Sequence, residues 1–95
     1  MNSKDKASFK IKRVIYELKK ALDEKDSKVL AVCSPQQLSN FITKFESILQ
    51  MIMMNNIPTK NERVLGIANL VAEQWPYDLE LGNILIDAEQ AYIEI

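Results

Sequence analysis

The sequence predicts an all-α protein, a small antiparallel bundle of about four helices that forms a single domain over residues 1–95. Apolar residues recur at steps of three and four, which is the spacing of amphipathic helices. Capping residues and prolines separate these apolar segments, and no two strand signals that could pair are present. With 47% hydrophobic and 26% charged residues, the composition is that of a folded globular domain.

The first predicted helix runs from about Ser3 or Asp5 to about Lys25. Its apolar stripe consists of Ile11, Ile15, Leu18 and Leu22, and Val14 and Ala21 widen it. The run Val29–Cys33 that follows is too short for periodicity to separate a strand from a helix. Because no second strand signal could pair with it, we predict a buried connector or a short helical turn.

A second helix is predicted to begin at Ser34-Pro35-Gln36-Gln37, with Ser at the N-cap, Pro at the first helical position and Gln at the third. It should end near Asn55-Asn56, because Asn tolerates the left-handed conformation and Pro58 disfavours helix in the residue before it. The inward side chains are Leu38, Phe41, Ile42, Phe45, Leu49 and Ile52.

The segment Thr59-Lys60-Asn61-Glu62 has the capping-box pattern and predicts the start of a third helix, which Pro76 ends. The inward side chains of this helix are Val64, Ile67, Ala68, Val71 and Trp75. Gly66 and Gly82 lie inside predicted helices, where glycine is costly. A close approach of the third and fourth helices is the simplest reason for them.

Asp78 is predicted to cap the N-terminus of the fourth helix. One face of that helix carries Leu81, Leu85, Ala88, Tyr92 and Ile95. Four amphipathic helices joined by short turns must bury their apolar stripes against one another, which is the reason for predicting a bundle.

The absence of histidine, together with a single cysteine, excludes histidine-based triads, His/Cys zinc sites and an internal disulfide. We therefore predict no catalytic residue, no metal site and no cofactor, and a protein that is not an enzyme. Cys33 is interpreted as a small buried side chain, because a nucleophilic thiol usually needs a neighbouring base.

Apolar stretches such as Ile48–Met54 are too short to cross a bilayer, so no membrane contact is predicted. The first residues are not followed by the apolar region of an export signal. A lone cysteine fits a reducing compartment. The sequence therefore favours a cytoplasmic protein.

Charge is unevenly distributed along the chain. Nine basic and five acidic residues precede Val29, whereas three basic and eight acidic residues follow from Val29 onward. No basic residue follows Arg63. On the fourth predicted helix Glu80, Asp87 and Glu94 recur at steps of seven residues, which places them on the face opposite the apolar stripe.

This acidic face has two interpretations. The simpler one is a solvated helix surface that the basic first helix partly neutralises. The functional one is a docking surface for a basic protein, because complementary charge raises the association rate and selects against wrong partners. Nearby tyrosines favour the second interpretation, since tyrosine is enriched in interface hot spots. The predicted partner-binding residues are Tyr77, Asp78, Glu80, Asp87, Tyr92 and Glu94.

Small size, the missing active site and the acidic face together predict a small cytoplasmic protein-binding module. Its most specific form is a bacterial immunity protein or antitoxin. Such a protein would neutralise a basic toxin by masking its active site, with the carboxylates placed in the toxin's cationic substrate groove. This prediction rests on analogy of fold and charge.

A nucleic-acid-associated regulator is the first alternative, and it would use the basic first helix. The residues involved would be Lys10, Arg13, Lys19 and Lys20. The net charge of −1, the interspersed carboxylates and an expected lack of exposed aromatic side chains among the lysines weigh against nucleic acid as a partner.

A structural module that self-associates, for example as a homodimer, is the second alternative. It would bury Met51, Met53 and Met54 at the end of the second predicted helix, since methionines form adaptable apolar contacts.

Overall fold

The computed structural model describes residues 2–95 and confirms the all-α prediction, with no strand in that range. The helices are α1 (Ser3–Asp23), α2 (Ser27–Leu30), α3 (Pro35–Met53), the short 3₁₀ helix η1 (Lys60–Arg63), α4 (Ile67–Gln74) and α5 (Glu80–Ile93).

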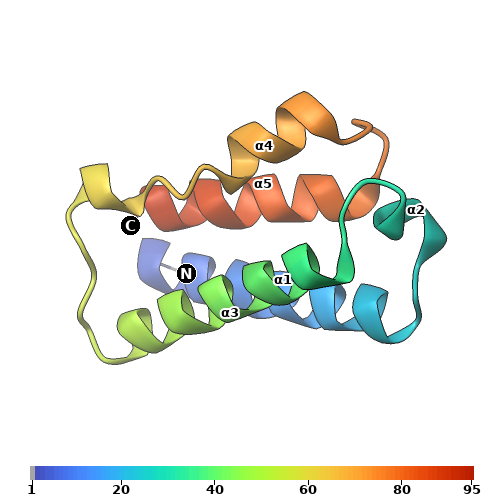
Figure 1. Cartoon of the computed structure of the whole chain (residues 1–95). Helices are drawn as coiled ribbons and strands as arrows, with labels where there is room; N and C mark the ends of the chain where they lie inside the picture. The colour runs from blue at the N-terminus through green and yellow to red at the C-terminus, as the bar shows by residue number, and fades with distance from the viewer. Residues whose placement is uncertain (1) are drawn as a thin grey trace.

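Helix α1 is the centre of the packing, because both α3 and α5 lie against it. Both of these helices run antiparallel to α1 (Figure 1). Helix α4 packs against α5, on the side away from α1. The two ends of the chain lie at one end of the molecule, and α2 lies with the turn between α4 and α5 at the other end (Figure 1).

The buried stripe of α1 differs slightly from the predicted one. The α1 residues that the bundle buries are Ala7, Ile11, Val14, Leu18 and Ala21. Ile15 and Leu22 are only half-buried. Val14 and Ala21 are buried as predicted. Ala7 is buried as well, because α1 meets two helices and its buried face is therefore wide and extends toward α5.

Helix α1 spans Ser3–Asp23, close to its predicted range. The predicted start and end of α3 are confirmed by its caps. The Ser34 hydroxyl accepts a hydrogen bond of 3.1 Å from the backbone N–H of Gln37, and Pro35 occupies the first turn of α3. Asn55, just after α3, has a positive φ of 57°, the left-handed conformation that ends helices. For Val29–Cys33 the prediction of a short helical turn is confirmed, since this run contributes to the short helix α2 and the turn after it.

The prediction of a helix starting at Thr59 is wrong. Only the 3₁₀ turn η1 forms there, Thr59 makes no side-chain capping bond, and Val64 is exposed in extended backbone. Helix α4 begins later, after Gly66, whose φ of 81° only glycine adopts easily. A carboxylate from α5 supplies the acceptors at this helix start, as described below.

Asp78 does not cap α5, which is a second wrong prediction. Leu79 occupies the N-cap position, and no side chain caps the helix there. The close approach at Gly82 is confirmed, since a Cβ at this position would lie 3.0 Å from Cγ1 of Val71 and 3.4 Å from Cε3 of Trp75. Gly82 therefore allows α4 to pack closely on α5.

Candidate functional site

The predicted partner-binding residues do not form one surface. Tyr77, Asp78 and Glu80 lie at the start of α5 and Glu94 at its end, about 21 Å away at a rise of 1.5 Å per residue. Tyr77 is 93% exposed. Tyr92 is 1% exposed and belongs to the core. Its assignment to the binding surface is therefore wrong, because a buried ring cannot contact another protein.

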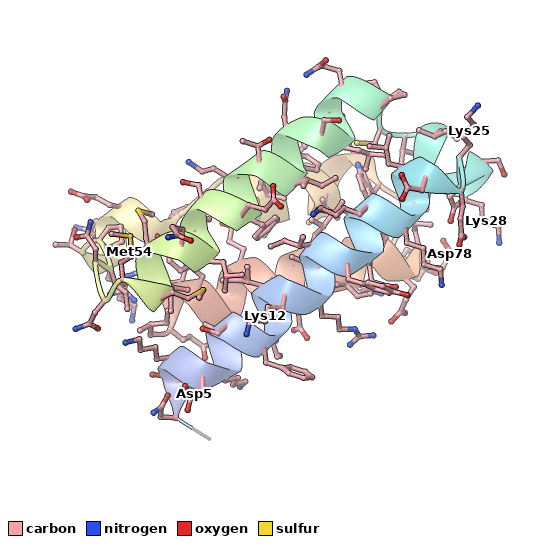
Figure 2. All side chains as sticks on the ribbon, turned by 90° about the horizontal axis from the view of Figure 1, so that it is seen from below. Asp5, Lys12, Lys25, Lys28, Met54 and Asp78 are labelled. Carbon is pink, nitrogen blue, oxygen red and sulfur yellow. The ribbon has the colours of Figure 1, made fainter. Side chains whose placement is uncertain are left out.

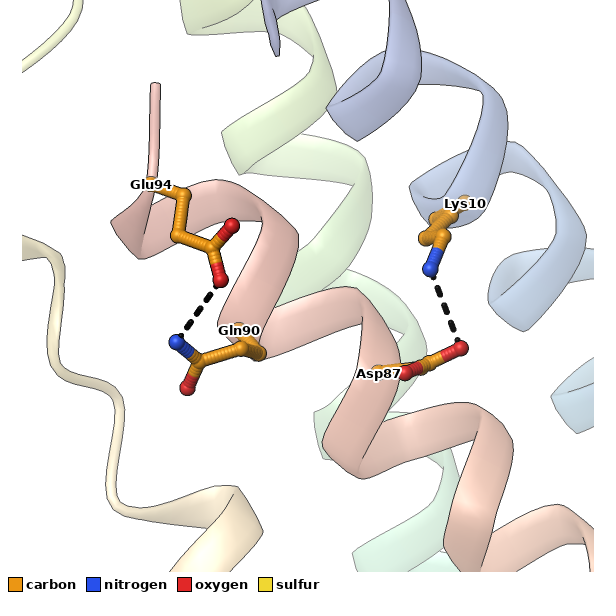
Figure 3. A network of polar contacts seen from close by, with 4 residues as sticks. All are labelled: Lys10, Asp87, Gln90 and Glu94. Carbon is orange, nitrogen blue, oxygen red and sulfur yellow. Dashed lines mark hydrogen bonds and ion pairs between the residues drawn. The ribbon is translucent and has the colours of Figure 1, made fainter.

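The second half of the predicted acidic face is engaged within the chain (Figure 3). Nζ of Lys10 on α1 lies 3.1 Å from Oδ2 of Asp87. Glu94 accepts a hydrogen bond of 2.9 Å from the side chain of Gln90. At Asp87 the structure agrees with the simpler of the two interpretations, partial neutralisation by the basic first helix, because α1 packs directly against α5. An exposed ion pair of this kind contributes little to stability.

The first half of the predicted face lies at a groove, which we call the acidic groove. It has a volume of about 380 Å³ and lies between α1, α2 and the start of α5. Its charged side chains are Glu17, Lys20, Glu24, Asp26, Lys28, Asp78 and Glu80. Its apolar side chains are Ala21, Val29, Leu79, Leu81 and Ile84. Figure 2 shows Asp78 and Lys28 at this end of the molecule.

The groove carries five carboxylates and two ammonium groups, so that its potential is negative. Asp26 already accepts hydrogen bonds from the backbone N–H groups of Lys28 and Val29, which caps α2. The other four carboxylates take part in none of the ion pairs found within residues 2–95. They are therefore available to a cation from outside the chain.

The side chains of the groove suit a lysine or arginine better than a bare metal ion. Within residues 2–95, no group of three or more acidic, Cys or His side chains is arranged to hold a metal. A lysine or arginine has an apolar stem as well as a charge. The stem can pack on Val29, Leu81 and Ile84 while the charge meets the carboxylates.

Sequence reasoning missed three members of this groove, namely Glu17, Glu24 and Asp26. From the sequence they were only three of the five acidic residues that precede Val29. The structure brings them beside Asp78 and Glu80, because α1 and α5 run antiparallel and the C-terminal half of α1 lies beside the start of α5. Only the pairing of two helices far apart in sequence reveals this.

Glu89 is the other residue that sequence reasoning missed. It is 2% exposed, and its carboxylate accepts hydrogen bonds from the backbone N–H groups of Leu65, Gly66 and Ala68 at 3.0, 3.3 and 2.8 Å. These contacts satisfy the start of α4, where the helix dipole favours a negative charge. Glu89 is thus a structural residue. The sequence did hold a signal for it, since Glu89 lies next to Ala88 of the apolar stripe.

Cys33 is buried, as predicted, at 2% exposure. Burial raises the pKa of its thiol from the ordinary 9.0 to about 11. The thiol therefore stays protonated and unreactive near neutral pH, although it precedes the start of α3.

The residues of the two alternative functions are placed as follows. Lys10 and Lys19 are engaged in ion pairs with Asp87 and Glu46. Phe9 and Tyr16 are exposed on the same helix, 62% and 65%, so the expected lack of aromatic side chains among the lysines is wrong. Of the methionines, Met51 is half-buried, whereas Met53 and Met54 are exposed.

Comparison of the chain with protein-family models and with curated proteins finds no match. No helix formed by residues 2–95 combines the length and the apolar character needed to span a bilayer.

Proposed function

We propose that the protein is a binding module that receives a basic partner protein in the acidic groove. One observation supports this proposal above all. Carboxylates from α1 and from the start of α5 line the same groove, together with apolar side chains; these carboxylates are Glu17, Glu24, Asp78 and Glu80. A concave surface with an excess of negative charge favours a cation on the partner.

Tyr77 supplies the second part of the binding surface. It directly precedes Asp78, which lines the groove, and it is almost fully exposed. A tyrosine brings a large apolar area and a hydrogen-bonding hydroxyl at low entropic cost. We expect Tyr77 to slow dissociation, while the carboxylates raise the rate of association.

The most specific form of this proposal is an immunity protein or antitoxin of a bacterial cytoplasm. Its partner would be a basic toxin whose substrate groove is cationic. The carboxylates of the acidic groove would bind there in place of an anionic substrate, so that binding and inhibition coincide. Support for this form is the small size of the chain and the negative potential of the groove.

Affinity capture from the cell of origin tests the proposal when three versions of the chain are compared. We expect the wild-type chain to retain a basic protein at moderate salt. The groove variant Asp78→Asn/Glu80→Gln should retain much less of it. The control variant Asp87→Asn/Glu94→Gln removes the same charge from the middle and the C-terminal end of α5 and should retain as much as the wild type.

The captured protein should also lose its activity when the wild-type chain is added in equal amount. Capture of a protein that is acidic, or that binds the groove variant as well as the wild type, would contradict the proposed function. A basic partner whose activity is unaffected would contradict only the antitoxin form.

Self-association remains a second proposal because Met53 and Met54 are both exposed at the end of α3. Sedimentation of the wild-type chain and of Met53→Glu/Met54→Glu tests it. A dimer that weakens in the variant supports self-association. A wild-type chain that is still monomeric at about 100 µM, where even a weak dimer would form, contradicts it.

A further inference from the structure

The side of α1 that faces away from the bundle carries two exposed aromatic rings among cations. Phe9 and Tyr16 are 62% and 65% exposed, and three basic side chains on the same side are exposed as well. We call these residues the α1 stripe: Phe9, Lys12, Arg13, Tyr16 and Lys20. At 3.6 residues per turn they fall opposite the buried residues of α1. Figure 2 looks at this side of α1, with Lys12 labelled.

The α1 stripe is basic although the whole chain is slightly acidic. Between Asp5 and Asp23, no carboxylate of α1 itself falls within it. Two carboxylates of neighbouring helices lie at its edges, Asp87 in a small pocket with Phe9 and Arg13, and Glu46 in one with Lys12. Glu17, on the flank toward α5, lines the acidic groove instead. The ion pairs formed within the described part of the chain engage Lys10 and Lys19, on the flanks of α1, and none of the cations of the stripe.

We propose that the α1 stripe binds single-stranded nucleic acid. Arg13 lies four residues after Phe9 and three before Tyr16, so a cation stands between the two rings. Rings and cations alternate over about 16 Å of helix, from Phe9 to Lys20. This matches a chain in which bases alternate with phosphates, because rings stack on bases and cations pair with phosphates.

The rings decide between a single strand and other anionic partners. In a duplex the faces of the bases are stacked on one another, so they are not available to Phe9 and Tyr16. An acidic protein segment offers carboxylates to the cations, but it offers no flat aromatic groups on which both rings could stack. A single strand can contact both kinds of side chain in the stripe, with its unpaired bases on the rings and its phosphates on the cations. The stripe shares Lys20 with the acidic groove, but neither ring lines the groove. The proposal therefore does not depend on the proposed partner protein.

The test is fluorescence anisotropy of labelled 20-nucleotide uridine and thymidine oligomers, with the whole chain, over a range of salt concentrations. We expect binding at low salt that weakens as salt rises. The slope of log K against log salt should be about −2, since three cations meet a single strand. A duplex of equal length should bind more weakly than either single strand.

Two variants separate stacking from charge. Phe9→Ala/Tyr16→Ala should weaken binding by about fivefold or more for each ring while leaving the salt slope unchanged. Lys12→Gln/Arg13→Gln/Lys20→Gln should flatten the slope. Tyr77→Ala is the matched control, because it removes an exposed ring elsewhere, and it should bind as the wild type does. Circular dichroism of each variant confirms that these exposed substitutions leave the helices intact.

Three results would overturn the proposal. The first is no binding at low salt. The second is binding that survives loss of both rings, which would show only general attraction to anions. The third is tighter binding to a polyglutamate peptide or to vesicles containing phosphatidylserine than to the single strands, which would assign the stripe to an acidic protein or a membrane surface.

Discussion

The carboxylate of Glu89 on α5 accepts a hydrogen bond of 2.8 Å from the backbone N–H of Ala68, in the first turn of α4. The other oxygen of the carboxylate accepts from Leu65 and Gly66. Helix α4 has no side-chain cap of its own. A residue more than twenty positions later in the chain therefore determines where α4 begins.

Replacing Glu89 should destabilise the fold strongly. Glu89→Ala leaves three backbone N–H groups without their acceptor, and we expect the free energy of unfolding to fall by about 3 kcal/mol. Glu89→Gln keeps one oxygen and should cost about half as much. Urea denaturation measures both. Glu94→Ala, an exposed change on the same helix, should stay within about 0.5 kcal/mol of the wild type; a similar loss in Glu94→Ala and Glu89→Ala would contradict the capping role.

Arg63 links the loop before α4 to the end of α5 through hydrogen bonds. Its guanidinium donates to the carbonyl oxygens of Pro58, Tyr92, Ile93 and Ile95 at 3.0 to 3.4 Å. Arg63→Lys keeps the charge but loses the planar set of donors, so we expect it to cost about 1 to 2 kcal/mol of unfolding free energy.

Hydrogen exchange locates that loss. In Arg63→Lys the amides of the loop after α3 and of the last turn of α5 should exchange faster, whereas those of α1 should keep their protection. Equal protection in Arg63→Lys and the wild type would show that a positive charge at position 63 is sufficient to hold the loop, and that the planar set of donors is not needed.

Gly82→Ala should destabilise the protein although alanine is the better helix former. The added Cβ would lie 3.0 Å from Cγ1 of Val71, and such overpacking outweighs a gain in helix propensity of up to about 1 kcal/mol. We expect a net loss of about 1 kcal/mol. In a Val71→Ala background the clash is absent, so the same substitution should be neutral or stabilising. A higher thermal midpoint for Gly82→Ala alone would refute the close contact.

Stability should fall at alkaline pH because burial raises the pKa of Cys33 from 9.0 to about 11. Between these values the unfolded chain loses the thiol proton and the folded chain keeps it, so rising pH favours unfolding. Burial also raises the pKa of Tyr92, against the lowering effect of Arg63, which adds to the loss above pH 10.0. Urea midpoints from pH 8 to 11 should decline less steeply in Cys33→Ala than in the wild type. Parallel declines would contradict a buried thiol.

Much of the fold was predictable because its signals are local. Ser34 and Pro35 mark the start of α3, and Asn55 marks its end, through contacts within a few residues. The start of α4 could not be predicted in the same way, since Thr59 and Glu62 match a capping pattern but Glu89 supplies the cap from α5. The start of α4 is therefore set by an acceptor far away in the sequence and not by the local capping pattern.

The candidate site was predictable only in part. Asp78 and Glu80 were named from sequence, but Glu17 and Glu24 join them only through the antiparallel packing of α1 on α5. Tyr92 could have been left out, because it lies four residues after Ala88 on the apolar face. The charge imbalance along the sequence did not predict an acidic groove and a basic stripe that share Lys20, since the basic α1 and the acidic α5 are neighbours.

The most direct test of the acidic groove is an NMR titration of the ¹⁵N-labelled chain with a short peptide of arginine and leucine residues. The account predicts the largest shift changes in Asp26–Val29 and Asp78–Leu81, with much smaller changes in Asp78→Asn/Glu80→Gln. Changes centred on Gln90–Ile95, or changes of equal size in the variant and the wild type, would contradict it.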